Sequence, residues 1–143
     1  MRQTLFISLS AILPILFQSC SNKNPTTADV IGTWANADGA TLELHKDGTF
    51  TGKSLPAVYF TFFTSKKDVE GKKVNGSGNW RIENGQGFEE VKLDFKKMND
   101  TAVYGFYSVM ISGAGGSLEN KPPWYLFVWK EEEGGQRYTF DKK

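Results

Sequence analysis

Short apolar segments separated by turn signals, at intervals of roughly ten residues, follow one another from residue 30 to the last residue. The clearest segment is 88–96, in which Val91, Leu93 and Phe95 alternate with charged residues. Alternation with a period of two places apolar side chains on one face of a strand and charged side chains on the other. No stretch of helical periodicity of useful length accompanies these segments. The sequence therefore predicts a single all-β domain over residues 30–143.

We expect about eight antiparallel strands paired in chain order, because each segment follows its neighbour after a turn. The expected strands are 30–35, 40–45, 49–53, 76–83, 88–96, 101–112, 123–130 and 136–140. Residues 55–64 are too rich in aromatic residues for an alternating strand, and they predict a fully buried strand, an aromatic loop or a short helix that plugs the fold. Strand counts near eight close a small up-and-down barrel, which is the predicted architecture; a two-sheet sandwich is the alternative.

The turn after the second expected strand can be predicted in detail. A two-residue loop at 47–48 would place Leu44 and Phe50 on opposite faces of the hairpin, whereas a three-residue loop at 46–48 pairs them. Burial of large apolar side chains on one face decides the register of a hairpin. We therefore predict the three-residue loop, with Gly48 in the left-handed conformation that such a loop requires.

Residues 1–19 have the features of a bacterial export signal, since Arg2 precedes an apolar run over 5–17. The run is shorter than the ~20 apolar residues that a membrane-spanning helix needs. It is followed by Ser19 and by Cys20, the only cysteine of the chain. This arrangement resembles the signal peptides of bacterial lipoproteins, in which the cysteine follows a small residue, carries the lipid and becomes the new N-terminus.

The resemblance to lipoproteins implies that Cys20 is the lipidation site. It also implies attachment to a membrane through the N-terminal lipid, in the bacterial cell envelope and on its periplasmic or extracellular face. Residues 20–29 are mostly polar or turn-forming, and we interpret them as a tether between the membrane and the folded domain.

The run Ile31-Gly32-Thr33-Trp34 resembles the opening of a lipocalin-like (calycin-type) barrel, although avidin-like barrels open in a similar way. The resemblance implies that Trp34 packs at the closed end of the barrel and that an arginine of the last strand, here Arg137, lies over its ring. Arg81 is the second candidate for that position. An ordinary core tryptophan at a strand start is the alternative, and a fold does not determine a function.

Aromatic residues are more numerous than one small core obviously needs, and they are the best candidates for a binding surface. The candidate ligand-lining residues are Tyr59, Phe60, Phe62, Tyr104, Phe106 and Trp124. At an open barrel mouth they would form an apolar pocket with polar tips. If they only fill the barrel, they form no pocket.

No residue pattern predicts catalysis, a metal or a cofactor. The chain has one histidine, His45, beside a turn, whereas structural zinc needs several cysteine or histidine ligands. A net charge of +1 gives no electrostatic reason to expect nucleic acid as a partner.

We therefore expect a monomeric, non-enzymatic lipoprotein that binds a small apolar ligand or a lipid inside a barrel. A protein-interaction module with an envelope-maintenance, inhibitor or immunity role, acting through surface loops, is the alternative. An aromatic-lined cavity of about 300 Å³ or more would favour ligand binding. A solid interior with an exposed apolar patch would favour a protein partner, and a buried carboxylate pair in a cleft would favour an enzyme.

Overall fold

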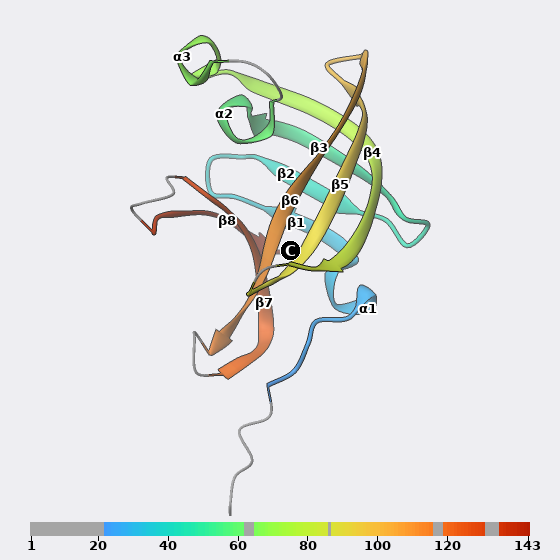
Figure 1. Ribbon diagram of the computed structural model, residues 1–143, viewed down its shortest axis with the longest axis vertical. Coiled ribbons are helices and arrows are strands. Elements are labelled where there is room, and N and C mark those ends of the chain that lie inside the picture. The colour runs from blue at the N-terminus through green and yellow to red at the C-terminus, as the bar shows by residue number, and fades with distance from the viewer. Residues whose placement is uncertain (1–21, 62–64, 86, 116–118, 131–134) are drawn as a thin grey trace, which may run out of the picture.

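The computed structural model describes residues 22–61, 65–85, 87–115, 119–130 and 135–143. Eight antiparallel strands pair in chain order, and β8 pairs with β1, so the sheet closes into a barrel (Figure 1). This confirms the predicted up-and-down barrel over the sandwich. The strands are β1 (Gly32–Ala35), β2 (Thr41–Leu44), β3 (Thr49–Pro56), β4 (Lys73–Asn84), β5 (Glu89–Met98), β6 (Thr101–Gly115), β7 (Glu119–Trp129) and β8 (Arg137–Lys142). In the described ranges, three short helices accompany them: α1 (Thr27–Val30), α2 (Ala57–Phe60) and α3 (Lys66–Val69).

Apolar side chains from all the strands meet inside the barrel. In β5 the predicted alternation is observed, because Val91, Leu93 and Phe95 are fully buried and the charged residues between them are not. Large aromatic side chains occupy much of the interior, and the rings of Phe50 and Phe95 meet edge to face with their centroids 4.9 Å apart. The interior of the barrel is therefore filled by the protein's own side chains.

The hairpin between β2 and β3 has the predicted register. Leu44 lies opposite Phe50, and both side chains are buried. The amide of His45 donates a hydrogen bond of 2.9 Å to the carbonyl oxygen of Thr49, which closes the three-residue loop. Gly48 has a φ of +83°, as the predicted loop requires, because a residue with a Cβ rarely adopts this conformation.

The aromatic segment 55–64 forms a short helix, one of its expected forms. β3 continues to Pro56, and α2 follows it directly at the end of the barrel that also carries α3 (Figure 1). Phe60 of α2 is fully buried among the core residues, and the hydroxyl of Tyr107 donates a hydrogen bond to the carbonyl oxygen of Thr61. The helix thus covers one end of the core.

The N-terminal segment lies at the opposite end of the barrel (Figure 1). The amide of Lys23 donates a hydrogen bond of 2.9 Å to the carbonyl oxygen of Asn120, and the amide of Asn120 donates one of 3.1 Å to Oδ1 of Asn22. Pro25 is buried, and α1 follows it. The part of the expected tether that the structure describes is therefore held against β7.

None of the described helices has the length and apolar character needed to cross a membrane.

Candidate functional site

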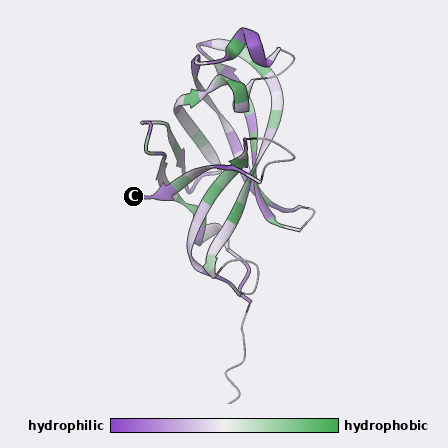
Figure 2. Ribbon diagram, turned by 90° about the vertical axis from the view of Figure 1, so that its left-hand side faces the viewer, coloured by the Kyte–Doolittle hydropathy of each residue, from purple (hydrophilic) through white to green (hydrophobic). Residues whose placement is uncertain are grey.

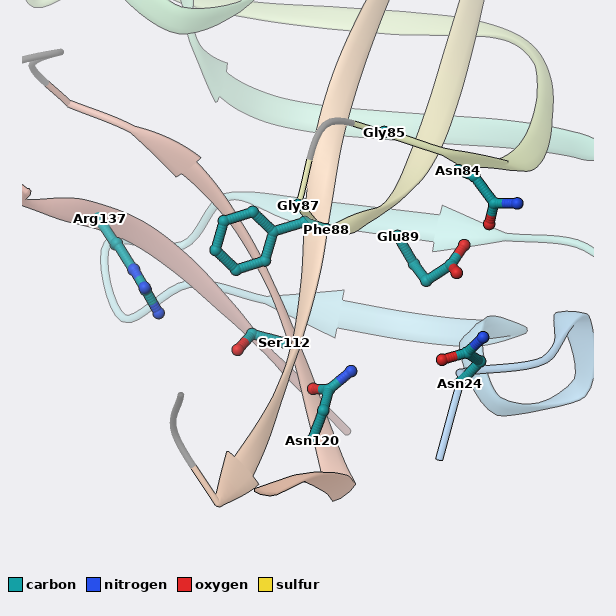
Figure 3. Close-up of a pocket in the computed structure, with 9 residues that line it drawn as sticks. All are labelled: Asn24, Asn84, Gly85, Gly87, Phe88, Glu89, Ser112, Asn120 and Arg137. Atoms are coloured by element: carbon teal, nitrogen blue, oxygen red, sulfur yellow. The ribbon is translucent and has the colours of Figure 1, made fainter. Parts of the chain in front are cut away.

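A cleft of about 550 Å³ opens where the N-terminal segment meets the β4–β5 and β6–β7 hairpins, and we call it the end cleft (Figure 3). Its described lining residues are Asn24, Asn84, Gly85, Gly87, Phe88, Glu89, Ser112, Asn120 and Arg137. They come from the N-terminal segment and from strands or turns that lie far apart in the sequence. Closure of the barrel brings them together.

Arg137 forms one wall of the end cleft, and aromatic groups hold its guanidinium in place. The guanidinium carbon lies 4.3 Å from the ring centroid of Phe127 and 5.0 Å from that of Trp129, and the ring of Phe88 is 6.0 Å away. One guanidinium nitrogen also donates a hydrogen bond to the hydroxyl of Tyr125. Stacking on aromatic faces and this hydrogen bond fix the orientation of the cation. Within the described part of the chain, no carboxylate forms an ion pair with Arg137.

Ser112 of β6 lies in the middle of the same wall. It is 7% exposed and is the one buried polar residue of the described chain. Its side chain and that of Arg137 point toward each other in Figure 3. No described residue forms a hydrogen bond with the Ser112 hydroxyl, which lines the cleft and is not a fully buried atom. Ser112 therefore offers an unused hydrogen-bonding group beside a fixed cation.

Amides and one carboxylate complete the lining of the end cleft. Oδ1 of Asn120 accepts a hydrogen bond of 3.0 Å from the amide of Gly113, which leaves the side-chain NH₂ group of Asn120 as a donor. The side-chain amide of Asn84 faces Glu89, and exchanging the oxygen and nitrogen of this amide satisfies both groups. The Asn84 nitrogen then lies 2.7 Å from both carboxylate oxygens of Glu89 and donates to them. In Figure 3 the Phe88 ring lies between Arg137 and Glu89. The cleft thus has a donor-rich half around Arg137 and an internally bonded carboxylate on the other side.

Half of the predicted ligand-lining residues lie inside the barrel or at its mouth. Phe60 and Trp124 belong to the core, and the ring nitrogen of Trp124 has no hydrogen-bond partner in the described structure. Tyr59 is partly buried, and its ring centroid lies 5.3 Å from that of Tyr138. It also lines a smaller cleft of about 270 Å³ beside α2. Phe62 lies outside the described residues.

The other two predicted residues lie on the outside of the barrel. Tyr104 and Phe106 of β6 are 86% and 63% exposed, and Nζ of Lys92 lies 4.2 Å from the centroid of the Phe106 ring. Since alternate residues of a strand share a face, the two rings are neighbours on one outer surface. The predicted residues therefore do not line one common pocket, because they divide between the core and this surface.

The predicted partner of Trp34 needs a correction. Trp34 of β1 is fully buried, and its ring nitrogen donates a hydrogen bond of 2.7 Å to the carbonyl oxygen of Val30. The cation over its ring is Lys142, whose Nζ lies 5.4 Å from the ring centroid. Arg137 instead stacks on Phe127, on the outer face of the sheet. The second candidate, Arg81, is exposed and forms an ion pair of 2.5 Å with Glu83.

Sequence reasoning did not identify Ser112, Asn120 or Glu89 as site residues, since none belongs to a motif.

His45 is partly exposed, with Nδ1 3.9 Å from a carboxylate oxygen of Glu43. Over the ranges that the structure describes, no group of three or more histidine, cysteine or acidic residues could hold a metal ion.

No protein-family model, no curated protein and no solved structure matches the chain. Small β-barrels serve many unrelated functions, so the architecture alone does not select one. Function must therefore be inferred from the geometry of the end cleft and of the exposed surfaces.

Proposed function

We propose that this protein is a lipid-anchored, non-enzymatic binding protein of the bacterial cell envelope and that its ligand occupies the end cleft. The contrast between a filled barrel and an open polar cleft is the observation that carries this proposal. Trp34, Phe50 and Phe95 are fully buried inside the barrel, so an apolar ligand there would have to displace core side chains. The end cleft has a volume of about 550 Å³, within the range of about 300–1,000 Å³ that is usual for small-molecule sites.

The donors of the end cleft indicate what kind of ligand it accepts. Arg137, Ser112 and Asn120 present a guanidinium, a hydroxyl and an amide to the same space (Figure 3). These groups favour a ligand with oxygen acceptors, above all an anionic one. The Phe88 ring adds an apolar wall beside them. We therefore revise the expected ligand from an apolar molecule inside the barrel to a molecule with an anionic or oxygen-rich group at its end.

The anchor is tested by Cys20→Ser, which removes the proposed acceptor of the lipid. The variant should accumulate as unprocessed precursor that does not partition into the detergent phase. The wild-type protein should be processed and should partition into the detergent phase. A variant that still yields mature, membrane-bound protein would show that the membrane attachment does not depend on Cys20.

Binding in the end cleft is tested by native mass spectrometry of protein purified from its host. A co-purifying molecule should add a defined mass to the wild type, and this mass should be reduced or absent in Arg137→Gln. Arg81→Gln is the matched control, because Arg81 is exposed and its side chain pairs with Glu83 outside the cleft. Equal occupancy in the wild type and both variants would place the ligand elsewhere.

A protein-interaction module is the second candidate, and the exposed rings of Tyr104 and Phe106 favour it. Exposed aromatic pairs are common at protein contacts. A photocrosslinking residue in place of Tyr104 should then give one discrete protein adduct in the host envelope. The same residue in place of Glu43, exposed on β2 and away from β6, is the control. Equal, diffuse labelling at both positions would argue against this candidate.

A further inference from the structure

We infer that the end cleft faces the membrane that anchors the chain and binds the phosphate of a phospholipid headgroup there. This inference rests on the proposed function, because it needs the lipid anchor at Cys20. Its first support is the place where the chain leaves the barrel. Asn22 and Lys23 are hydrogen-bonded to Asn120, and Asn120 and Asn24 both line the end cleft. The N-terminal segment therefore runs along the edge of the cleft.

The length of chain between the anchor and this attachment is very short. Cys20 precedes Asn22 by two residues, and an extended chain spans at most ~3.6 Å per residue, so their Cα atoms are no more than about 7 Å apart. The headgroup layer on each side of a bilayer is of similar thickness, about 5–8 Å. A lipid on Cys20 would therefore hold the edge of the end cleft formed by Asn22 and Asn120 close to the headgroups. Figures 1 and 2 show α2 and α3 at the far end of the barrel, away from this surface.

The chemistry of the cleft matches the phosphate of a headgroup that enters it. The guanidinium of Arg137 is a good partner for phosphate oxygens, and it is already oriented by Phe127 and Tyr125. The Ser112 hydroxyl points toward it and is free to donate to the same oxygens. Lys23, exposed between two asparagines of the N-terminal segment, adds positive charge at the surface, which anionic headgroups attract.

One carboxylate lines the same cleft, and its position permits an anion at Arg137. Glu89 is bonded to the Asn84 amide, and the Phe88 ring separates it from Arg137 in Figure 3. An amphiphile could place its phosphate beside Arg137 and its glycerol or acyl carbons against Phe88. This arrangement distinguishes a phospholipid from free phosphate, which would gain nothing from the apolar wall.

Binding is measured on the lipidated protein, purified from host membranes in a non-ionic detergent. Dihexanoylphosphatidylglycerol and inorganic phosphate are titrated separately, with tryptophan fluorescence as the signal because Trp129 lies beside Arg137. The phospholipid should bind saturably and at least about tenfold more tightly than inorganic phosphate. Loss of one charge-assisted contact should weaken phospholipid binding by about tenfold or more in Arg137→Gln. Arg81→Gln should bind like the wild type.

Ser112→Ala is the second variant, since removing this hydroxyl leaves the aromatic contacts of Arg137 in place. It should weaken phospholipid binding by a smaller factor, about threefold to tenfold. Thermal unfolding of each variant shows whether the barrel is intact. Equal affinity for phosphate and phospholipid would assign the cleft to a free anion instead of a lipid. Unchanged phospholipid binding in both cleft variants would overturn the inference.

The orientation is tested separately in vesicles of phosphatidylethanolamine and phosphatidylglycerol. A fluorophore attached through Lys23→Cys should be quenched by headgroup spin labels, and one attached through Lys67→Cys, in α3, should not. Equal quenching at both positions would refute the orientation even where the anchor is present. Failure of the anchor itself would already be visible as detergent partitioning that does not depend on Cys20, so the two failures can be told apart.

Discussion

The hydroxyl of Tyr138 donates a hydrogen bond of 2.7 Å to Oδ1 of Asp38, 100 residues earlier in the chain. The same carboxylate oxygen accepts a hydrogen bond of 3.1 Å from the amide of Ala40. The contact therefore links the β1–β2 turn to β8, the strand that closes the barrel. Burial opposes ionisation of Asp38, but the hydrogen bonds from Tyr138 and Ala40 and the charge of Lys73 outweigh it and lower the pKa of this carboxyl.

Tyr138→Phe removes this link and should destabilise the protein in a pH-dependent way. At about pH 7 the loss should be about 1 kcal/mol, typical of one hydrogen bond. A carboxyl whose pKa is lowered by folding stabilises the protein above its usual value of 3.8, and that contribution is lost as the pH falls through the lowered value. The wild type should therefore lose stability below about pH 4 more steeply than the variant.

Urea unfolding of both proteins at several pH values measures this difference. The gap between the wild type and Tyr138→Phe should narrow in acid, as Asp38 becomes protonated. A gap that stays constant from neutral to acid pH would show that the hydroxyl acts independently of the Asp38 charge.

The core and the outer surface of the barrel should respond very differently to loss of an aromatic ring. Phe60→Ala removes a fully buried ring that packs against Tyr107 and Phe140, and it should cost about 3–5 kcal/mol. Tyr104→Ala removes an 86% exposed ring and should change the free energy of unfolding by less than about 0.5 kcal/mol. Denaturant unfolding of both variants measures the two changes in the free energy of unfolding. A large loss in the Tyr104 variant would mean that this ring is covered in solution.

Much of the barrel could be predicted because local patterns determine it. The alternation around Val91, Leu93 and Phe95 specifies a buried face without any knowledge of the partners. The pairing of Leu44 with Phe50 follows from burial and from the loop that Gly48 permits. In both cases the decisive interactions lie within a few residues of one another in the sequence.

The cation over Trp34 was predicted wrongly because the resemblance supplied Arg137, whereas alternation turns Arg137 to the outer face and the last strand is longer than expected. The sequence suggested that it ends at Phe140, whereas β8 continues to Lys142. Tyr138, Phe140 and Lys142 share one face by alternation, so the extension carries Lys142 to the Trp34 ring and leaves Arg137 on the outer face. Arg137 faces outward in a strand of either length, and the two additional residues supply the cation that lies over Trp34.

The end cleft could not have been predicted from the sequence alone. Arg137, Ser112 and Asn120 come from three strands, and their relative positions depend on register through an irregularity between Gly113 and Gly115. A shift of one residue in β6 would turn Ser112 to the other face of the sheet, and the same shift in β8 would turn Arg137. No local pattern determines such long-range offsets between strands.

Lys142 should stabilise the barrel through its two contacts at the end of β8. Its Nζ lies over the Trp34 ring and donates a hydrogen bond of 2.6 Å to the carbonyl oxygen of Asp29. Lys142→Gln should lower the free energy of unfolding by about 0.5–2 kcal/mol, the range of a cation–π contact. Lys143→Gln is the matched control, since it removes the same charge from the exposed last residue and should have little effect. Equal losses in the two variants would indicate a general charge effect.

Asn22 should control how firmly the N-terminal segment is held at the end cleft. Its Oδ1 accepts the amide hydrogen of Asn120, whose carbonyl oxygen in turn accepts that of Lys23. Asn22→Ala removes the first bond and should weaken the second. Loss of about 1 kcal/mol of local stability should accelerate hydrogen exchange of the Lys23 amide about fivefold, while the Val91 amide in the core exchanges as before. Asn79→Ala, at an exposed position of β4, should leave the Lys23 amide unaffected. An unchanged Lys23 rate in Asn22→Ala would show that other contacts, such as the buried Pro25, hold the segment in place.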